Sequence, residues 1–273
     1  MRNPREQEEF RGLYARLEDL SVRAEQGELA VSDFLSPREA HYAGLFLARR
    51  GVSYRLFGGY GEAERQRLYL LPDYMTETVE SEEEQGAEAE SWLSLFGFTS
   101  EITALRIRGS GYRTLTHRDY LGSLLGLGLE RSVLGDILVA SEEPEAVVFC
   151  ETAIAAFLEN EMTQVANDKV RVTRADMAAL RIPPRRFLPI HDTVASPRLD
   201  SLVAALCGLS REKGREAVVS GMVEINFESE ERPDRTVTAP ALLSIRGFGR
   251  YRILALTDRT KKGRVRLEAE KYL

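Results

Sequence analysis

The apolar positions at the start of the chain are spaced for helices and short strands. Over residues 4–30 they recur every three or four positions, which predicts a helix with one apolar side. The residues on that side are Phe10, Leu13, Leu17 and Leu20. A second helix is predicted to begin at Ser36, because Ser36-Pro37-Arg38-Glu39 has the form of a capping box, and to end at Gly51. Short apolar runs then predict strands at 52–57 and 67–71.

The middle of the chain changes to short strands that alternate with helices. The expected order is strand, helix, strand, strand, helix, strand, at residues 102–108, 116–125, 133–139, 146–150, 151–160 and 169–173. This β-α-β-β-α-β order is that of ferredoxin-like and RRM-type domains. Phe149 is the only aromatic residue on a middle strand, so base stacking by the face of this sheet does not follow from the sequence.

From Ser196 onward, two short helices are predicted to pack on a small, basic sheet. Ser196 is a natural N-cap, and Pro197 suits the first helical position. One side of the first helix is apolar and consists of Leu199, Leu202, Val203 and Leu206. We expect Gly208 to end this helix, Ser210 to cap the next one and Gly221 to end it.

These patterns place the chain in the α+β class, and its length favours two or three domains. An N-terminal α/β domain is expected over residues 1–90, ending in an acidic segment, and an RRM-like domain over 91–180. Residues 181–195 are rich in proline, which predicts a semi-rigid linker. The C-terminal domain of two helices and a small sheet then covers 196–273.

Charge is distributed unevenly along the 273 residues. The formal net charge is −6, yet the stretch from His191 to the end has 15 Lys and Arg against 12 Asp and Glu. No base interrupts the seven glutamates between Glu77 and Glu90, and this run is expected to be a disordered or loosely helical insert. A mildly acidic protein with a basic end can bind RNA locally and avoid it elsewhere.

Metal-binding patterns and membrane segments are absent from the sequence. The two cysteines are far apart and the three histidines are scattered, so no metal site is predicted. The chain begins without an apolar signal segment, and no apolar stretch approaches the roughly 20 residues that span a membrane. We therefore expect a soluble protein of the cytoplasm.

The start of the second C-terminal helix carries cations where a helix disfavours them. Arg211 and Lys213 lie in its first turn, and the partial positive charge of a helix N-terminus repels cations. The same N-terminus attracts phosphate, so the cations are explained if an anion binds between them. The alternative is a solvated face paired with Glu212 and Glu216, which accounts for a single charge but less well for the cluster. Between residues 244 and 266, eight bases stand against one acid.

Four short motifs in this region resemble the S-four RNA-binding domain, named for a protein of the small ribosomal subunit. They are Arg198-Leu199-Asp200, Leu209-Ser210-Arg211, Ser220-Gly221-Met222-Val223-Glu224-Ile225-Asn226 and Ser244-Ile245-Arg246-Gly247-Phe248-Gly249-Arg250. The resemblance implies RNA binding through the two helices and the following loop, with contacts at Arg198, Ser210, Arg211, Lys213, Gly214, Arg246 and Arg250. The other members of the predicted RNA-binding set belong to the same basic stretch; they are Arg215, Gly247, Gly249, Lys261, Lys262 and Arg264.

Over nearly its whole length the chain also resembles the bacterial YlmH family. The residues that carry this resemblance are Phe57-Gly58-Gly59-Tyr60, the run from Leu115 to Leu125, Gly135-Asp136-Ile137-Leu138-Val139 and the S-four-like end. The resemblance implies an N-terminal domain, a central RNA-binding domain and a C-terminal S-four domain. It also implies association with large ribosomal subunits that carry a stalled peptidyl-tRNA, in a quality control that adds C-terminal tails to stalled chains.

The predicted function is therefore that of a non-catalytic, monomeric RNA-binding protein whose partners are ribosomal RNA and tRNA on the large subunit. One alternative is an RNA-modifying enzyme of the pseudouridine synthase or methyltransferase type, because S-four domains also precede such domains. The sequence has neither a glycine-rich cofactor turn nor a large domain with a catalytic aspartate, so no catalytic residue and no cofactor are predicted. A second alternative is a cell-division scaffold, for which no residue argues.

Overall fold

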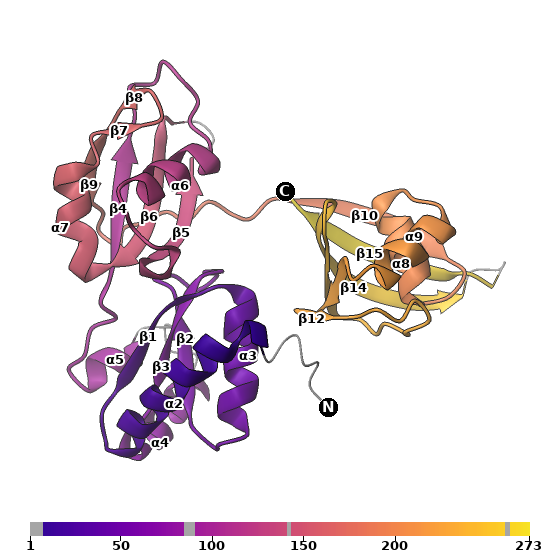
Figure 1. Ribbon diagram of the computed structural model, residues 1–273, viewed down its shortest axis with the longest axis horizontal. Coiled ribbons are helices and arrows are strands. Elements are labelled where there is room, and N and C mark those ends of the chain that lie inside the picture. The colour runs from indigo at the N-terminus through magenta and orange to yellow at the C-terminus, as the bar shows by residue number, and fades with distance from the viewer. Residues whose placement is uncertain (1–7, 85–90, 141–142, 260–262) are drawn as a thin grey trace. The chain divides into compact units, whose positions relative to one another are not determined.

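The computed structural model describes residues 8–84, 91–140, 143–259 and 263–273. The chain divides into two compact units, Met1–Pro183 (unit 1) and Pro184–Leu273 (unit 2), shown in Figure 1. Each unit has hydrophobic clusters of its own. Both combine helices with antiparallel sheets, so the predicted α+β class is confirmed.

Unit 1 begins with a three-stranded sheet that is covered on one face by two helices. The elements are α2 (Arg11–Glu25), β1 (Ala30–Leu35), α3 (Pro37–Ala48), β2 (Tyr54–Phe57) and β3 (Gln66–Leu70), in the sheet order β1-β3-β2. Leu17 of α2 is buried in one cluster with Leu68 and Leu70 of β3. The capping box is confirmed, because the Ser36 hydroxyl accepts from the Glu39 N–H and the Glu39 carboxylate accepts from the Ser36 N–H.

Helix α2 is shorter than the helix that was predicted over residues 4–30. Gly27 follows it in the left-handed conformation, with φ of 90°, and the chain then turns into β1, a strand that was not predicted. Of the two alternatives predicted for the acidic run, the helical one holds for its first part, which is the end of α4 (Asp73–Glu84). Met75 and Val79 anchor α4 in the core. The glutamates of this run in residues 85–90 lie outside the described residues.

The central part of unit 1 is a four-stranded sheet with the order β5-β6-β4-β9. After α5 (Ser91–Leu95) come β4 (Ile102–Arg108), α6 (His117–Gly126), η1 (Arg131–Val133), β5 (Leu134–Val139), β6 (Glu145–Glu151), α7 (Thr152–Glu161), β7 (Gln164–Val165), β8 (Asp168–Lys169) and β9 (Arg171–Arg174). The strands and helices of this sheet follow the predicted order. The short β7–β8 hairpin and η1 are additions that the apolar pattern did not indicate.

The N-terminal and central sheets share a core, so the predicted division at residue 90 does not separate two units. One buried cluster joins Phe34 and Tyr69 of the first sheet to Ala104 and Phe149 of the second. A Cβ on Gly59 would lie 2.4 Å from the Phe149 ring, which shows how closely the β2–β3 loop approaches. Phe149 is therefore covered by protein and cannot stack on a base.

The turn around Tyr60 and the strand around Asp136, which carried part of the family resemblance, meet at this junction. Asp136 of β5 accepts from the Tyr60 hydroxyl at 2.7 Å and from the backbone N–H groups of Glu64 at 2.7 Å and Arg65 at 3.0 Å. These bonds satisfy the carboxylate and fix the β2–β3 loop. The motifs around Tyr60 and Asp136 thus have a structural role at the junction of the two sheets.

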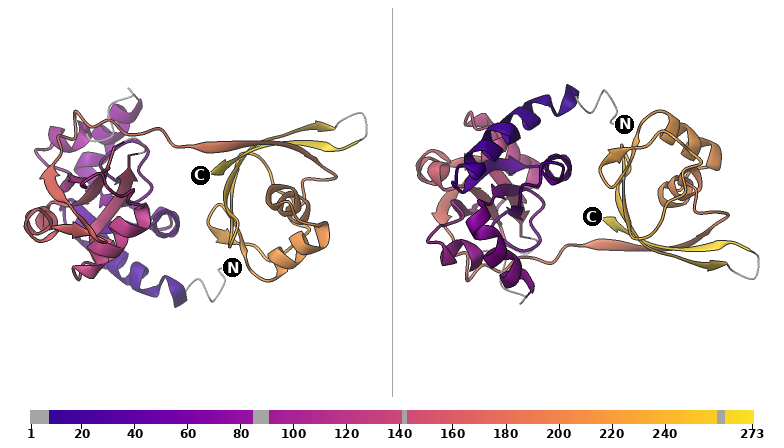
Figure 2. Two further views of the ribbon diagram at one scale, coloured as in Figure 1. Left: turned by 90° about the horizontal axis from the view of Figure 1, so that it is seen from above. Right: turned by 90° about the horizontal axis from the view of Figure 1, so that it is seen from below.

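Unit 2 is a six-stranded antiparallel sheet that curves around one side of two short helices, as Figure 2 shows. Its elements are β10 (Phe187–Val194), α8 (Leu199–Cys207), α9 (Arg211–Val219), β11 (Val223–Ile225), β12 (Glu228–Ser229), β13 (Ala241–Ile245), β14 (Gly249–Arg259) and β15 (Val265–Tyr272), in the order β10-β15-β14-β13-β11-β12. The predicted apolar side of α8 forms the core with Val218 of α9 and Leu243 of β13. No helix in the described part of the chain has the length and apolar character needed to cross a membrane.

Two predictions at the start of unit 2 are wrong. The expected linker over 181–195 contains β10, which pairs with β15 from Phe187 opposite Tyr272 to Val194 opposite Val265. The prolines misled the prediction, because an edge strand such as β10 tolerates a proline. The N-cap of α8 is Arg198 and not Ser196. The N–H groups of Leu199 and Asp200 donate instead to backbone carbonyls of residues 235 and 233, which removes the need for a side-chain cap.

Candidate nucleic-acid interface

Helix α9 presents three of the predicted cations at its start. Ser210 caps the helix as predicted, and its hydroxyl accepts from the Lys213 N–H at 3.3 Å. The side chains of Arg211, Lys213 and Arg215 are all exposed. Because a helix N-terminus carries partial positive charge of its own, this end of α9 is electropositive.

A buried carboxylate lies among these cations. Asp200, in the first turn of α8, has only 4% of its side chain exposed and accepts from the Nε atoms of Arg198 and Arg211, each at 3.3 Å. It also accepts from the Ser201 N–H at 2.8 Å. Burial acts to raise the pKa of Asp200, but the Arg198 hydrogen bond and the Arg211 charge outweigh burial and hold the pKa below its ordinary value. The chain itself therefore supplies part of the negative charge that the sequence led us to expect from a ligand.

The arginines around Asp200 line a pocket of about 830 Å³ at the start of the two helices. Its lining residues are Arg198, Asp200, Arg211, Glu212, Arg215, Pro233 and Asp234. The Arg211 side chain remains 58% exposed although its Nε bonds to Asp200. A guanidinium has five N–H donors, so Arg198 and Arg211 can each donate to a phosphate while other N–H groups of the same guanidinium donate to Asp200. Three arginines and three carboxylates therefore line the pocket, and the arginine N–H groups that do not bond to Asp200 are available to a phosphate.

Asp200 is the residue of this site that the sequence prediction missed. The motif Arg198-Leu199-Asp200 was assigned a contact only at its arginine. The sequence did contain a signal for Asp200. An aspartate is favoured in the first turn of a helix, and there it can form an ion pair with cations of a helix that packs alongside. The pairing with Arg211 depends on the packing of α8 against α9, which the spacing along the chain does not reveal.

We expect Asp200→Asn to lower the free energy of unfolding of unit 2 by about 1–3 kcal/mol at pH 7, because an amide cannot replace the charge-assisted bonds to two arginines. The folded-state pKa of Asp200 lies below its unfolded-state value. Its stabilisation is therefore fully present above the unfolded-state pKa of about 4 and is lost as pH falls through the folded-state pKa. Urea unfolding of both proteins from pH 7 to pH 3 checks this, and a difference that stays constant over this range would contradict it.

Gly214, a predicted contact residue, has a role in the packing of α9 against α8. It is buried where α9 crosses α8, and a Cβ at this position would lie 2.6 Å from the Asp200 carbonyl oxygen and 3.0 Å from the Ala204 nitrogen. Only glycine permits this close approach of the two backbones. The effect of Gly214 on the site is indirect, because the approach sets the positions of Asp200 and Arg211.

The motif from Ser244 to Arg250 contains a glycine turn between two strands, near the other end of α9. Residues 246–248 connect β13 to β14, with Ile245 opposite Gly249 and with φ of 85° at Gly247 and 117° at Gly249. The Arg246 N–H donates to the carbonyl of Met222, just beyond α9, and its side chain is exposed. Arg250 stacks over the Tyr272 ring at 4.8 Å. This turn forms a second basic group, separate from the Asp200 pocket.

Arg264 has a bonding role in the sheet in addition to its charge. Its Nε donates to the Thr193 hydroxyl at 2.9 Å, and its Nη2 donates to the Thr193 carbonyl. These bonds join β15 to β10 at the end of the sheet from which the chain enters α8. With a rise of about 3.3 Å per residue along β14, this end is about 30 Å from Arg250. The predicted contacts Lys261 and Lys262 lie outside the described residues.

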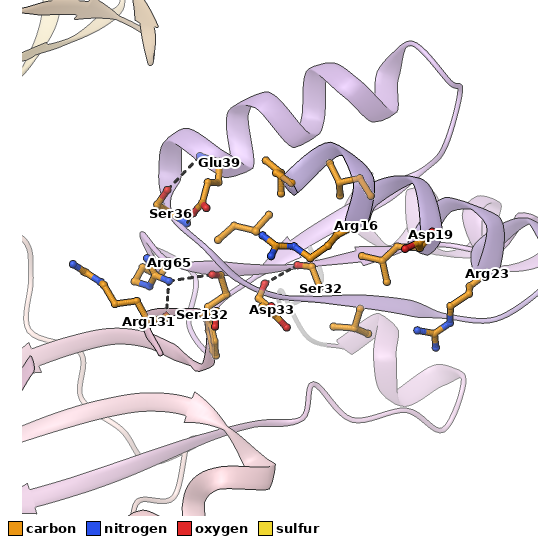
Figure 3. A pocket seen from close by; sticks show the side chains of 16 residues that line it. Arg16, Asp19, Arg23, Ser32, Asp33, Ser36, Glu39, Arg65, Arg131 and Ser132 are labelled. Carbon is orange, nitrogen blue, oxygen red and sulfur yellow. Dashed lines mark hydrogen bonds between the residues drawn. The ribbon is translucent and has the colours of Figure 1, made fainter. Parts of the chain in front are cut away.

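Unit 1 contains a further pocket of about 610 Å³ between α2 and β1, drawn in Figure 3. Leucines of α2 form one wall, and Arg65 and Arg131 lie at one end. Arg65 donates to the carbonyls of Leu134 at 2.8 Å, Phe34 at 3.0 Å and Arg131 at 2.7 Å, and burial together with the Arg131 charge lowers its pKa. The guanidinium of Arg65 thus joins β1, η1 and β5 through these three carbonyls.

The described residues provide little for metal or thiol chemistry. No group of three or more His, Cys, Asp or Glu among them is arranged to hold a metal ion. Burial raises the pKa of the Cys150 thiol to about 12, so this cysteine is not a nucleophile at neutral pH. Burial also raises the pKa of Cys207, whose sulfur lies 3.9 Å from the Tyr251 hydroxyl.

Two helices on an antiparallel sheet, with paired arginines around a pocket at the helix starts, define a protein with a basic unit suited to anionic ligands. Residues 100–179 match the family described as "Putative RNA-binding domain in YlmH". Over 256 residues the chain is 32% identical to the "Ribosome-associated protein quality control protein P2" of Bacillus subtilis (strain 168). This match covers 93% of this chain and 92% of that protein. The chain belongs to the YlmH family.

A solved structure supports the fold assignment. The "Cell division protein ylmH from Streptococcus pneumoniae" matches with a TM-score of 0.50 and 18% sequence identity. The match covers 67% of this chain and 98% of that chain. At this identity the likeness concerns the fold alone.

Proposed function

We propose that this protein is a non-catalytic RNA-binding factor that acts on ribosomes, with unit 2 as an S-four-type domain. The observation that carries the proposal is the pocket in which buried Asp200 fixes Arg198 and Arg211 at the start of α8 and α9. Arginines that are already fixed lose less conformational freedom when they bind, so a phosphate of structured RNA is held in one geometry. This is a device for positioning RNA and requires no chemistry.

The finer assignment is binding to ribosomal RNA and tRNA on the large subunit during quality control of stalled nascent chains. The name of the Bacillus subtilis relative supports a ribosomal role, and the match of residues 100–179 supports RNA as the ligand. In this role the protein acts in the cytoplasm as a monomer and without a cofactor. An RNA-modifying activity and a cell-division scaffold are the competing outcomes of the test.

The test is sedimentation of the tagged, full-length protein through sucrose gradients at low and moderate salt. We expect it to migrate with large subunits, and more strongly when peptidyl-tRNA is trapped on them. Arg215→Glu, which leaves both arginine partners of Asp200 in place, should shift the protein to the top of the gradient because it repels phosphate. Arg49→Glu, an equal change at an exposed position of unit 1, should migrate like the wild type.

A parallel measurement separates a factor from an enzyme. Nucleosides of RNA from a deletion strain are compared with those of the parent strain, and a binding factor predicts no missing modification. Protein that stays at the top of the gradient at both salts, together with a missing modified nucleoside, would overturn the proposal in favour of an RNA-modifying enzyme. Unchanged nucleosides without sedimentation would favour the scaffold.

A further inference from the structure

The loop between β4 and α6 holds a tyrosine almost completely in solvent. Tyr112 is 98% exposed, whereas the other exposed large apolar side chains of the described residues reach 75% at most. An aromatic ring with this exposure contributes nothing to the core. Tyrosine rings combine an apolar face with a polar hydroxyl, which makes them frequent contact residues for partners.

The loop is fixed, so the position of Tyr112 is built into the fold. Asp168 of β8 is buried and accepts from the Ser110 N–H at 3.1 Å and from the Ser110 hydroxyl. The Ser110 hydroxyl in turn accepts from the Tyr112 N–H at 3.3 Å, and the Gly109 N–H donates to the Pro144 carbonyl at 2.7 Å. These bonds hold the backbone of the loop up to Tyr112, so the position from which the ring projects into solvent is fixed.

Two unpaired arginines lie where this loop leaves the sheet. Arg108, at the end of β4, stands directly opposite Arg171 of β9 on one side and opposite Glu145 of β6, which pairs with Arg106, on the other. Both are exposed, and no carboxylate of the described residues forms an ion pair with either. Like charges in directly opposite positions destabilise a sheet, and a bound anion between them removes this repulsion. Their neighbours differ, since Arg106 pairs with Glu145 at 3.0 Å and Arg174 with Glu159 at 3.1 Å.

The two arginines and the tyrosine share one end of the central sheet. Leu105 and Ile107 of β4 point into the core under α6 and α7, so Arg108 points to the opposite face. The β7–β8 hairpin, which binds the loop through Asp168, lies at this end together with the loop (Figure 1). Exposed Lys169 of β8 adds a further cation.

We propose that this end of the central sheet binds an unpaired segment of RNA, with one base stacked on Tyr112 and the adjoining phosphates held by Arg108 and Arg171. The proposal rests on the proposed function and adds to it a second RNA site, in unit 1, with a single-stranded ligand. An aromatic ring beside cations is the combination by which proteins bind single strands, because every base offers a stacking face and every nucleotide a phosphate. A regular duplex keeps its bases stacked inside and does not offer one to Tyr112.

The test uses the full-length protein and fluorescence anisotropy with an unstructured oligouridine and with a perfect RNA duplex of equal length. We expect Tyr112→Ala to weaken binding of the single strand about tenfold, in the range measured for loss of one stacked base, and to leave duplex binding unchanged. Tyr112→Phe keeps the ring and should bind like the wild type. Arg108→Ala combined with Arg171→Ala should weaken single-strand binding and make its salt dependence shallower by about two phosphate contacts.

Matched controls test whether the effect belongs to this site. Phe157→Ala removes another exposed ring of unit 1, and Arg11→Ala with Arg49→Ala removes two exposed cations elsewhere in the unit. Neither should change the affinity for the single strand. Because the ring of Tyr112 is outside the core, Tyr112→Ala should also keep the wild-type melting temperature.

Stacking itself has a spectroscopic readout. In Tyr112→Trp the indole replaces an exposed ring, and its fluorescence should be quenched by oligouridine, while buried Trp92 of the wild type should not respond. Wild-type affinity in Tyr112→Ala, or an equal loss in the Phe157→Ala control, would overturn the proposed site while RNA binding by the wild type still stands. A wild-type protein that binds neither RNA would overturn the proposed function as well.

Discussion

Replacing Lys213, Arg215 and Arg246 together with alanine should lower the affinity of the protein for structured RNA roughly 100-fold at 0.1 M salt. Each phosphate contact contributes about 0.7–0.9 to the slope of log affinity against log salt. Three lost contacts therefore remove roughly 2–3 units of slope, and each unit is a factor of about ten between 1 M and 0.1 M salt. The three side chains are exposed and none of them bonds to Asp200, so the fold should remain intact.

The measurement is a salt titration of binding to large-subunit RNA, with unfolding curves of each protein for comparison. The matched control is the triple alanine variant of Arg11, Arg49 and Arg118, which are exposed cations of unit 1. It removes the same charge and should keep both the slope and the affinity near their wild-type values. An unchanged slope in the unit 2 variant would show that its basic groups are not the contact surface.

The choice of these residues depends on the structure. A double replacement of Arg211 and Lys213 follows from the sequence, but Arg211 is a partner of buried Asp200. Its removal leaves a buried carboxylate with fewer partners, and loss of binding would then be confused with loss of stability. A fragment for such measurements should begin at residue 184, because β10 is part of the sheet of unit 2.

Local signals in the sequence were sufficient for most single elements. The capping box at Ser36, the cap at Ser210 and the left-handed Gly208 at the end of α8 each depend on a few neighbouring residues, and all three are present in the structure. The apolar side of α8 was also predictable, because a helix of this size must bury one side. Local rules therefore located the helices that carry the site.

The features that decide how the site works depend on contacts between distant residues. The pairing of β10 with β15 and the junction through Asp136 join residues that are far apart in the sequence. The prolines of residues 181–195 therefore suggested a linker where the structure has a strand, and the change of pattern near residue 90 suggested a division within unit 1. The pairing of Asp200 with Arg211 likewise needs α8 and α9 in contact. Tyr112 lies in a loop whose anchoring by Asp168 appears only in three dimensions, and a search for aromatics on strands passes over it.

Gly214→Val should lower the free energy of unfolding of unit 2 by about 3 kcal/mol, and Gly214→Ala by about 1–3 kcal/mol. A Cβ at position 214 would lie 2.6 Å from the carbonyl oxygen of Asp200 and 3.1 Å from the Cβ of Ala204. One of these atoms is a backbone oxygen and the other is a Cβ, so neither can move aside as the end of a flexible side chain could. The two helices therefore have to separate. The higher helix propensity of alanine offsets only about 1 kcal/mol of this cost.

Separation of the two helices should also weaken RNA binding, because Asp200 lies on α8 and its partner Arg211 lies on α9. Urea unfolding of fragment 184–273 measures the stability. Fluorescence anisotropy with structured RNA measures the affinity, which we expect Gly214→Ala to lower at temperatures where the variant is still folded. Gly122→Ala in α6 is the contrasting control, since a Cβ there meets no atom within 4 Å. That change should stabilise unit 1 by about 0.4–1 kcal/mol through the unfolded state. A Gly214→Ala variant as stable as the wild type would mean that the close approach of α8 and α9 is not required for the fold, and full RNA affinity in that variant would separate the pocket from the helix packing.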